Sequence, residues 1–277
     1  MIPTKQLNDG TAIPILAIGT GKSEDHKNYV GQDCRASLTQ ALKLGIRHID
    51  TGERFENEKY VGEVKQDAYL SVKLGNTRLP AKRIEESLAL LQTSAVDLYM
   101  VHSSKTLLSL LGIPRGWAEM EQVHAAGKAK SIGVASFTYQ DLEELLSSCK
   151  VKPSVFQTEF HPYVYTANQP LLELCARHEI TVSCFGTLVP LYKHVGPVDE
   201  AVAQIAEQTG LSRAQVLMKW ALQVSKGIVV MRSGKEEHMK EAVEAVTGPP
   251  LAEEQIAAIT EAGRGHHFRR YQKHMDG

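Results

Sequence analysis

Short apolar runs alternate with longer amphipathic segments along most of the chain. The apolar runs are about five residues long and predict strands at 47–50, 69–73, 96–102, 131–135, 155–159, 181–185 and 228–231. The segments between them carry apolar residues at helical spacing and predict helices at 34–44, 58–64, 81–91, 117–126, 140–147, 169–178, 198–208, 213–224, 236–245 and 252–262. Parallel strands covered by helices have this nearly continuous apolar character. The pattern therefore predicts an α/β protein built on a parallel sheet.

The two ends of the chain depart from this alternation. Residues 5–18 predict a β-hairpin, because Asn8-Asp9-Gly10 is a turn sequence that tolerates positive φ, and the second arm ends at Gly19 and Thr20. About eight strand–helix units without a Pro/Gly/Ser-rich linker favour one closed (β/α)8 TIM barrel over residues 1–277, not two domains. We expect the basic, His-rich residues 264–277 to form a flexible, solvated tail; the alternative is a segment that folds over the barrel mouth.

Composition and charge restrict the class of protein. The 277 residues are 43% hydrophobic and 23% charged, as in a soluble globular protein. The formal net charge of −1 does not indicate binding to nucleic acid or to an anionic membrane surface. No apolar run approaches the ~18 residues that span a membrane. The four cysteines include no CxxC pair and the N-terminal residues lack the apolar core of a signal peptide, so we expect reduced thiols in a cytoplasmic protein. No metal site is predicted.

Three ionisable side chains, Asp50, Lys73 and His102, follow apolar residues at equivalent strand ends. In a (β/α)8 barrel, functional side chains gather at the C-terminal ends of the strands, and an acid, an amine and an imidazole meeting there would shift one another's pKa values. Taken separately, Asp50 and Lys73 could form a structural ion pair and His102 could be a core histidine, but their joint occurrence favours a site. Phe55 is the one aromatic residue in the polar loop 51–58, and it offers that site no proton and no hydrogen bond.

Three stretches together resemble the aldo-keto reductase family. Residues 45–62 match a G-[FY]-R-H-x-D-T-A segment followed by E-x-x-x-G, apart from Ile46 and Gly52, and the other stretches are GKAKSIGV at 127–134 and QTEFHP at 157–162. The resemblance covers nearly the whole chain and implies a barrel whose bottom is closed by the N-terminal hairpin. It also implies a monomer that acts on a small-molecule substrate with NADP(H), which the family binds without the GxGxxG motif that this sequence lacks.

The resemblance implies a catalytic group of Asp, Tyr, Lys and His. Asp50, Lys73 and His102 fill three of these places, and Phe55 stands where the proton-donating tyrosine belongs. Losing such a general acid typically costs about 10²–10⁴ in rate. His102 or a water held by Lys73 could replace part of its role, whereas Tyr60 lies at a helical position and is not expected to substitute.

The cofactor-binding residues that the resemblance implies also depart from the family pattern. The Ser-Asn pair that usually holds the nicotinamide carboxamide is Ala135-Ser136 here, and the tyrosine that stacks on the nicotinamide is Phe185. Arg232 and Ser233 stand where a basic residue and a serine hold the 2′-phosphate, and His238 replaces an arginine. The expected cofactor-binding residues are Gly19, Thr20, Asp50, Ser136, Gln157, Phe185, Arg232, Ser233 and His238.

Three classes of function stay open at this point. The first is an NADPH-dependent oxidoreductase acting on a small carbonyl, conjugated or imine substrate. The second is a non-redox isomerase, lyase or cyclase in which Lys73 and His102 serve as acid and base. The third is an inactive protein that binds NADPH or a metabolite. The sequence also leaves open whether Phe55 is natural or introduced, although the accompanying changes at 135 and 185 favour natural divergence.

Overall fold

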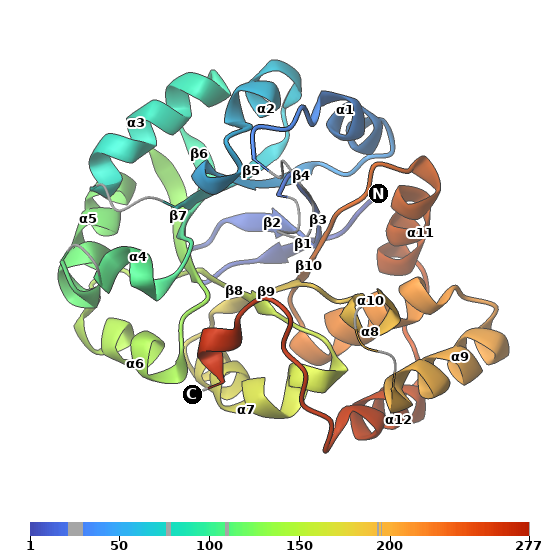
Figure 1. The fold of residues 1–277 in the computed structure, drawn as a ribbon. Helices are drawn as coiled ribbons and strands as arrows, with labels where there is room; N and C mark the ends of the chain where they lie inside the picture. Colours follow the sequence, from blue (N-terminus) through green and yellow to red (C-terminus); the bar gives the residue numbers. More distant parts are fainter. Residues whose placement is uncertain (22–29, 76–78, 109–110, 193, 195, 277) are drawn as a thin grey trace.

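A closed barrel of eight parallel strands forms the centre of the computed structural model, which describes residues 1–21, 30–75, 79–108, 111–192, 194 and 196–276 (Figure 1). Around the barrel the strands follow the order β10, β3, β4, β5, β6, β7, β8, β9. Their bounds are β3 Leu16–Gly19, β4 His48–Gly52, β5 Tyr69–Leu74, β6 Val96–Val101, β7 Ala129–Ala135, β8 Val155–Glu159, β9 Thr181–Phe185 and β10 Ile228–Met231. The predicted (β/α)8 barrel is confirmed.

Amphipathic helices cover the outside of the barrel and bury their apolar faces against the strands (Figure 1). Local signals fix some of their ends: Ser212 and Gln215 form a capping box at the start of α10, for example. The helices are α1 Arg35–Lys43, α2 Glu58–Val64, α3 Pro80–Leu91, α4 Ser104–Leu108, α5 Ile113–Ala125, α6 Tyr139–Ser148, α7 Pro162–Arg177, α8 Val189–Tyr192, α9 Pro197–Thr209, α10 Arg213–Ser225, α11 Glu236–Thr247 and α12 Glu253–Gly263, with short 3-10 turns η1 Glu53–Phe55 and η2 Lys273–Met275. In the described part of the chain, none of these helices has the length and apolarity to cross a membrane.

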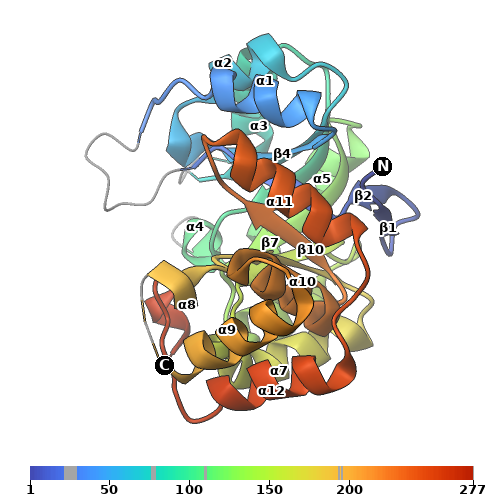
Figure 2. The ribbon, with the colours of Figure 1, turned by 90° about the vertical axis from the view of Figure 1, so that its right-hand side faces the viewer.

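The N-terminal hairpin closes one end of the barrel, as the resemblance implied. Strands β1 (Thr4–Gln6) and β2 (Ala12–Pro14) pair antiparallel, and Leu7 and Ile13 pack against apolar side chains of β6, β8 and β10. The hairpin lies on one side of the barrel and the C-terminus on the opposite side (Figure 2). The prediction that the hairpin extends to Ile18 was wrong, because Leu16–Gly19 is the first barrel strand and pairs with β4 and β10. Residues 16–18 are at most 1% exposed, so this apolar run suits a fully covered strand and not a hairpin arm.

Some helices also differ from the predictions in their bounds or were not predicted. Helix α7 begins at Pro162, not at residue 169, and continues through Pro170. A proline inside a helix is costly, so the sequence favours a boundary there, but the burial of Tyr163, Val164 and Asn168 outweighs that cost. The short helices α4 and α8 were not predicted, because four or five residues are too few to show helical periodicity.

Candidate active site

Asp50, Lys73 and His102 lie close together at the barrel mouth because they belong to neighbouring strands. Asp50 is in β4, Lys73 is in β5, and His102 directly follows β6. The register pairs Gly52 with Lys73, and a Cβ at Gly52 would lie 2.8 Å from the Lys73 Cβ. This close approach of β4 and β5 accounts for the glycine where the family pattern has alanine.

A buried ion pair joins the first two residues. Lys73 Nζ contacts Asp50 Oδ1, and the Lys73 and Asp50 side chains are only 3% and 6% exposed. Gln157, in β8, donates from Nε2 to Asp50 Oδ2 at 2.9 Å and to Ser183 Oγ at 3.2 Å. Both oxygens of the Asp50 carboxylate are therefore partnered, and the pair holds a cation at the centre of the mouth.

The ring of Phe55 lies beside this cation and beside His102. Lys73 Nζ is 5.6 Å from the ring centroid, and the ring meets His102 edge-on with centroids 5.9 Å apart and planes at 72°. Gly21 gives the ring room, because a Cβ there would lie 2.5 Å from Phe55 Cε1 and Cζ. A six-membered ring is thus held within reach of both candidate catalytic groups, but it carries no oxygen.

The imidazole of His102 is neutral at physiological pH. Burial lowers the pKa of His102 to about 3, and the positive charges of Lys73 and Arg54 add to the effect while Asp50 opposes it. Among the described residues, His102 Nδ1 has no hydrogen-bond partner. The ring can therefore donate one N–H to a substrate oxygen, but it cannot serve as the protonated donor that the sequence left open.

Three polar side chains connect the loop that carries Phe55 to the end of β3, the first barrel strand. Thr20 donates from Oγ1 to Thr51 Oγ1 at 2.8 Å and to Asn57 Oδ1 at 3.2 Å, and Asn57 Nδ2 donates to the Thr20 carbonyl at 3.1 Å. The Thr20 N–H donates to the Asp50 carbonyl at 3.0 Å, and Gly19 pairs with Asp50 in the barrel register. Asn57 is fully buried and was missed, because an asparagine before a helix ordinarily indicates a solvated cap.

The candidate phosphate-binding residues lie after β10, at the start of α11. Ser233 Oγ is 3.2 Å from His238 Nδ1, and His238 lines a groove of about 500 Å³ with Tyr192, Arg213 and other residues of α8 to α11. Cationic and hydroxyl groups beside a helix N-terminus are suited to bind phosphate. Arg232 and Ser233 are therefore chemically suited to the adenosine 2′-phosphate of NADP(H), whereas the groove beside His238 is also lined by the acidic side chains of Asp199, Glu237 and Glu241.

The two remaining cofactor candidates, Ser136 and Phe185, contact the C-terminal segment (residues 264–276). Gln272 Nε2 donates to Ser136 Oγ at 2.5 Å, and the rings of Tyr271 and Phe185 have centroids 5.8 Å apart. Partial burial lowers the pKa of Arg232, and Tyr271 opposes this shift. No pattern in the sequence predicts these contacts.

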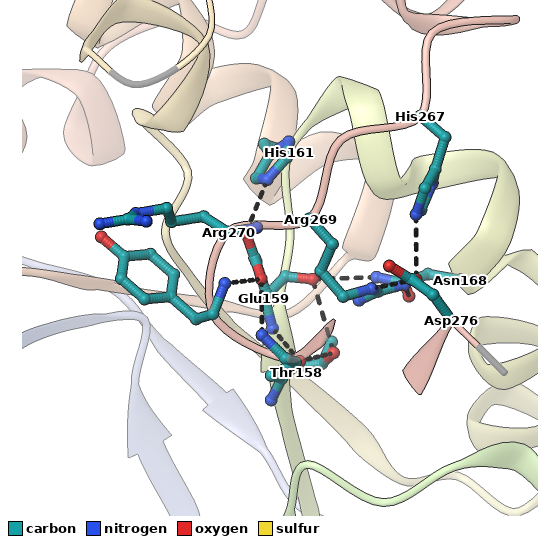
Figure 3. Close-up of polar contacts among 10 residues, drawn as sticks. Thr158, Glu159, His161, Asn168, His267, Arg269, Arg270 and Asp276 are labelled. Carbon is teal, nitrogen blue, oxygen red and sulfur yellow. Dashed lines mark hydrogen bonds and ion pairs between the residues drawn. The ribbon is translucent and has the colours of Figure 1, made fainter. Parts of the chain in front are cut away.

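Glu159 binds the C-terminal segment to the barrel (Figure 3). Its fully buried carboxylate accepts the backbone N–H groups of Arg270, Tyr271 and Gln272 at 2.8, 2.8 and 3.1 Å, and His161 Nε2 lies 3.0 Å away. In the structure the segment is therefore packed over the barrel mouth, which was the alternative to a flexible, solvated tail. The sequence signal that could have indicated a buried anchor was Glu159 itself, an acid at the end of a predicted barrel strand.

No cluster of three or more His, Cys, Asp or Glu side chains suited to a metal ion occurs among the residues that the structure describes.

Comparison with known proteins places this chain in a family. The model of the aldo/keto reductase family matches residues 15–264, so the chain belongs to the aldo/keto reductase family. One relative is the NAD/NADP-dependent indole-3-acetaldehyde reductase of Schizosaccharomyces pombe, which is 34% identical over 95% of this chain and 96% of its own length. Another is the NADPH-dependent alpha-keto amide reductase of Saccharomyces cerevisiae, which is 32% identical over 94% and 90%. The resemblance in the sequence is confirmed.

Solved structures agree with this assignment. An aldo/keto reductase from Brucella melitensis superimposes with a TM-score of 0.81 at 30% identity, over 95% of this chain and 100% of that chain. A second aldo-keto reductase, from a deep-sea metagenome library, gives a TM-score of 0.82 at 26% identity, over 97% of both chains.

Proposed function

We propose that this protein is an NADP(H)-dependent reductase of a small carbonyl, conjugated or imine substrate that works without the phenolic proton donor. The observation that carries the proposal is the position of the Phe55 ring, which is held against Lys73 and His102 while the Asp50–Lys73 ion pair remains intact. The names of the two yeast relatives, one an NAD/NADP-dependent and the other an NADPH-dependent reductase, support the cofactor assignment.

The residues divide between binding and chemistry. Arg232, Ser233 and His238 would hold the 2′-phosphate, and Ser136 and Gln157 the carboxamide of the nicotinamide, with Phe185 against its ring. The cofactor supplies hydride to an electrophilic carbon. The protein then has to stabilise the negative charge that develops on the substrate, and the neutral His102 N–H and the Lys73 cation can do so by hydrogen bonding and by charge.

The missing hydroxyl favours some substrates over others. A simple ketone becomes an alkoxide, which needs a proton from solvent if no acid is at hand. A protonated imine accepts hydride and becomes a neutral amine, so it requires no proton at that step. A conjugated double bond gives a delocalised enolate, which needs less stabilisation than an alkoxide. We therefore expect imines and conjugated carbonyls to be reduced faster than isolated ketones.

The geometry favours this function over a non-redox one. Lys73 is bound to Asp50, and the conjugate acid of His102, with a pKa of about 3, is too strong to accumulate at neutral pH. An acid–base pair for elimination or isomerisation would need His102 to exchange a proton near pH 7. The monomeric state and the cytoplasmic location stay predictions.

The test is Phe55→Tyr, assayed by NADPH oxidation with a panel of ketones, aldehydes, enones and imines. Restoring the phenol should raise ketone reduction by about 10²–10⁴ and affect imine reduction much less. Phe55→Leu is the control, because it removes the ring without adding a hydroxyl and should give no gain. Absence of NADPH oxidation by both the parent and Phe55→Tyr with every substrate would contradict the proposal and favour a binding protein.

A further inference from the structure

The C-terminal segment brings a carboxamide to one of the proposed cofactor residues. Gln272 is 3% exposed, and its Nε2 donates to Ser136 Oγ at 2.5 Å. The two residues are 136 positions apart in the chain, so only the packing of this segment over the barrel mouth brings them together. The proposed function assigns no role to Gln272.

The orientation of the Gln272 amide follows from its other hydrogen bonds. Its Oε1 accepts the backbone N–H of Glu159 at 2.8 Å and the Thr158 hydroxyl at 2.9 Å. A backbone N–H can only donate, so the amide oxygen must face Glu159 and the amide nitrogen must face Ser136. The Ser136 oxygen therefore accepts from Gln272, which leaves the Ser136 proton to be donated elsewhere.

Backbone contacts fix Ser136 and Gln272 in place. The Gln272 N–H donates to Glu159 Oε2 at 3.1 Å, and the Ser136 N–H donates to the Gln157 carbonyl at 3.0 Å. His274 Nε2 lies 3.2 Å from the Ser136 carbonyl oxygen. Ser136 has a φ of 57°, an uncommon conformation for a residue with a side chain. The partly exposed Ser136 hydroxyl is thus held in one orientation, because backbone hydrogen bonds fix both Ser136 and Gln272.

We propose that Gln272 is a positioning residue for the cofactor, which holds the Ser136 hydroxyl so that its proton is donated to the carboxamide oxygen of the nicotinamide. The inference rests on the proposed function. It also gives a physical reason for the change from a Ser-Asn pair to Ala135-Ser136, because the C-terminal segment supplies an amide beside the serine.

The first test is Gln272→Glu, studied by calorimetric titration with NADP⁺ and with 2′,5′-ADP. A glutamate keeps the acceptor for Glu159 and Thr158, but its second oxygen accepts the Ser136 proton instead of donating to Ser136. The Kd for NADP⁺ should rise about tenfold, the effect of losing one hydrogen bond. The Kd for 2′,5′-ADP, which contains the phosphorylated adenosine and no nicotinamide, should not change. Lys273→Ala, at an exposed position in the same segment, is the control and should alter neither Kd.

The new acid in Gln272→Glu lies beside Glu159 and can itself loosen the segment. A double-mutant cycle therefore tests the proposal without adding charge. Gln272→Met removes the amide without adding charge, and it should also weaken NADP⁺ selectively. Ser136→Ala should raise the Kd for NADP⁺ by itself, and Gln272→Met should add nothing in that background, since the two residues act as one unit. Additive effects would overturn the proposed route through Ser136.

The direction of the change separates this proposal from its opposite. Tighter NADP⁺ binding in the Gln272 variants would mean that the C-terminal segment competes with the cofactor. Unchanged binding would mean that Gln272 is only structural. Either result overturns the inference about Gln272 but does not contradict the reductase proposal. A parent protein that binds neither NADP⁺ nor 2′,5′-ADP would overturn both.

Discussion

Two buried glutamates at this end of the barrel have opposite pKa shifts. Glu159, under the C-terminal segment, and Glu58, behind the Phe55 loop, are 0% and 2% exposed. Burial alone raises the pKa of each. At Glu159 the hydrogen bonds from His161 and from the Tyr271 and Arg270 backbone outweigh burial and lower the pKa. At Glu58 the pKa rises to about 7, because burial and the charge of Glu53 prevail over Ser87 and Arg83.

The difference lies in the number of donors, not in the depth of burial. Four N–H groups converge on Glu159, whereas Glu58 Oε1 has no hydrogen-bond partner among the described residues. The Glu159 carboxylate is thus saturated, whereas Glu58 Oε1 and His102 Nδ1, on the side that carries Phe55, have no partner among the described residues; neither have His161 Nδ1 and Arg269 Nη1 on the Glu159 side. The two glutamates therefore differ in how well each carboxylate is solvated by the protein, and a buried carboxylate without enough donors keeps its proton to higher pH.

The largest effect is expected when the donors around Glu159 lose their acceptor. Glu159→Gln presents an amide NH₂ to two backbone N–H groups, and each buried donor left without a partner costs about 1–3 kcal/mol. We expect the free energy of unfolding to fall by about 2–4 kcal/mol, measured by urea denaturation. Trypsin should also cleave the C-terminal segment much faster, because it contains Arg264, Arg269, Arg270 and Lys273. Glu261→Gln, at a site 66% exposed, is the control; equal cleavage of the two variants would disprove the anchoring role.

Glu58→Gln should act in the opposite direction and only at higher pH. The folded-state pKa of Glu58 is about 7 against an ordinary value of 4.5, so the stability it contributes is present below about pH 4.5 and is lost as the pH rises through 7. The parent should therefore lose stability between pH 5 and 8, and Glu58→Gln should remove most of that decline and be about 1–3 kcal/mol more stable at pH 8.

The matched control for Glu58 is Glu63→Gln on the same helix, since Glu63 is exposed and paired with Arg35 at the surface. It should change stability by no more than about 0.5 kcal/mol at any pH. Glu159 should show the reverse dependence: its pKa is lowered, so its contribution is present above pH 4.5 and is lost only in acid. A parent protein with constant stability from pH 5 to 8 would rule out the raised pKa of Glu58.

The barrel and the three ionisable residues at its mouth were predictable because both depend on local pattern. Each apolar run predicts a strand by itself, and Asp50, Lys73 and His102 stand at strand ends that a closed barrel must bring together. The first strand was misassigned because Leu16–Gly19 follows the hairpin with no turn signal between them.

The C-terminal half of the site was not predictable in the same way. The contact between Gln272 and Ser136 joins residues 136 positions apart, and no periodicity or spacing encodes it. Composition favoured a solvated tail because residues 264–277 are basic and His-rich, yet the donors that fix the segment are mostly backbone N–H groups, which every non-proline residue carries. Glu159 in β8 accepts three of these backbone N–H groups, and this role becomes visible only when the fold is known.

The smallest effect is expected at the far end of the C-terminal segment. Asp276 pairs with Arg269 at 2.5 Å and with His267 at 2.9 Å, and Arg269 Nη2 donates to Asn168 Oδ1 at 3.1 Å (Figure 3). Asn168 in turn donates to the Glu159 carbonyl at 2.9 Å, so Asp276 is linked to Glu159 only through Arg269 and Asn168. Asp276→Asn should cost about 1 kcal/mol, because its carboxylate is 30% exposed and partly screened. Hydrogen exchange should show a several-fold loss of protection at the amides of residues 270–272 with the barrel strands unchanged, and unaltered protection there would mean that Glu159 holds the segment without help from its terminus.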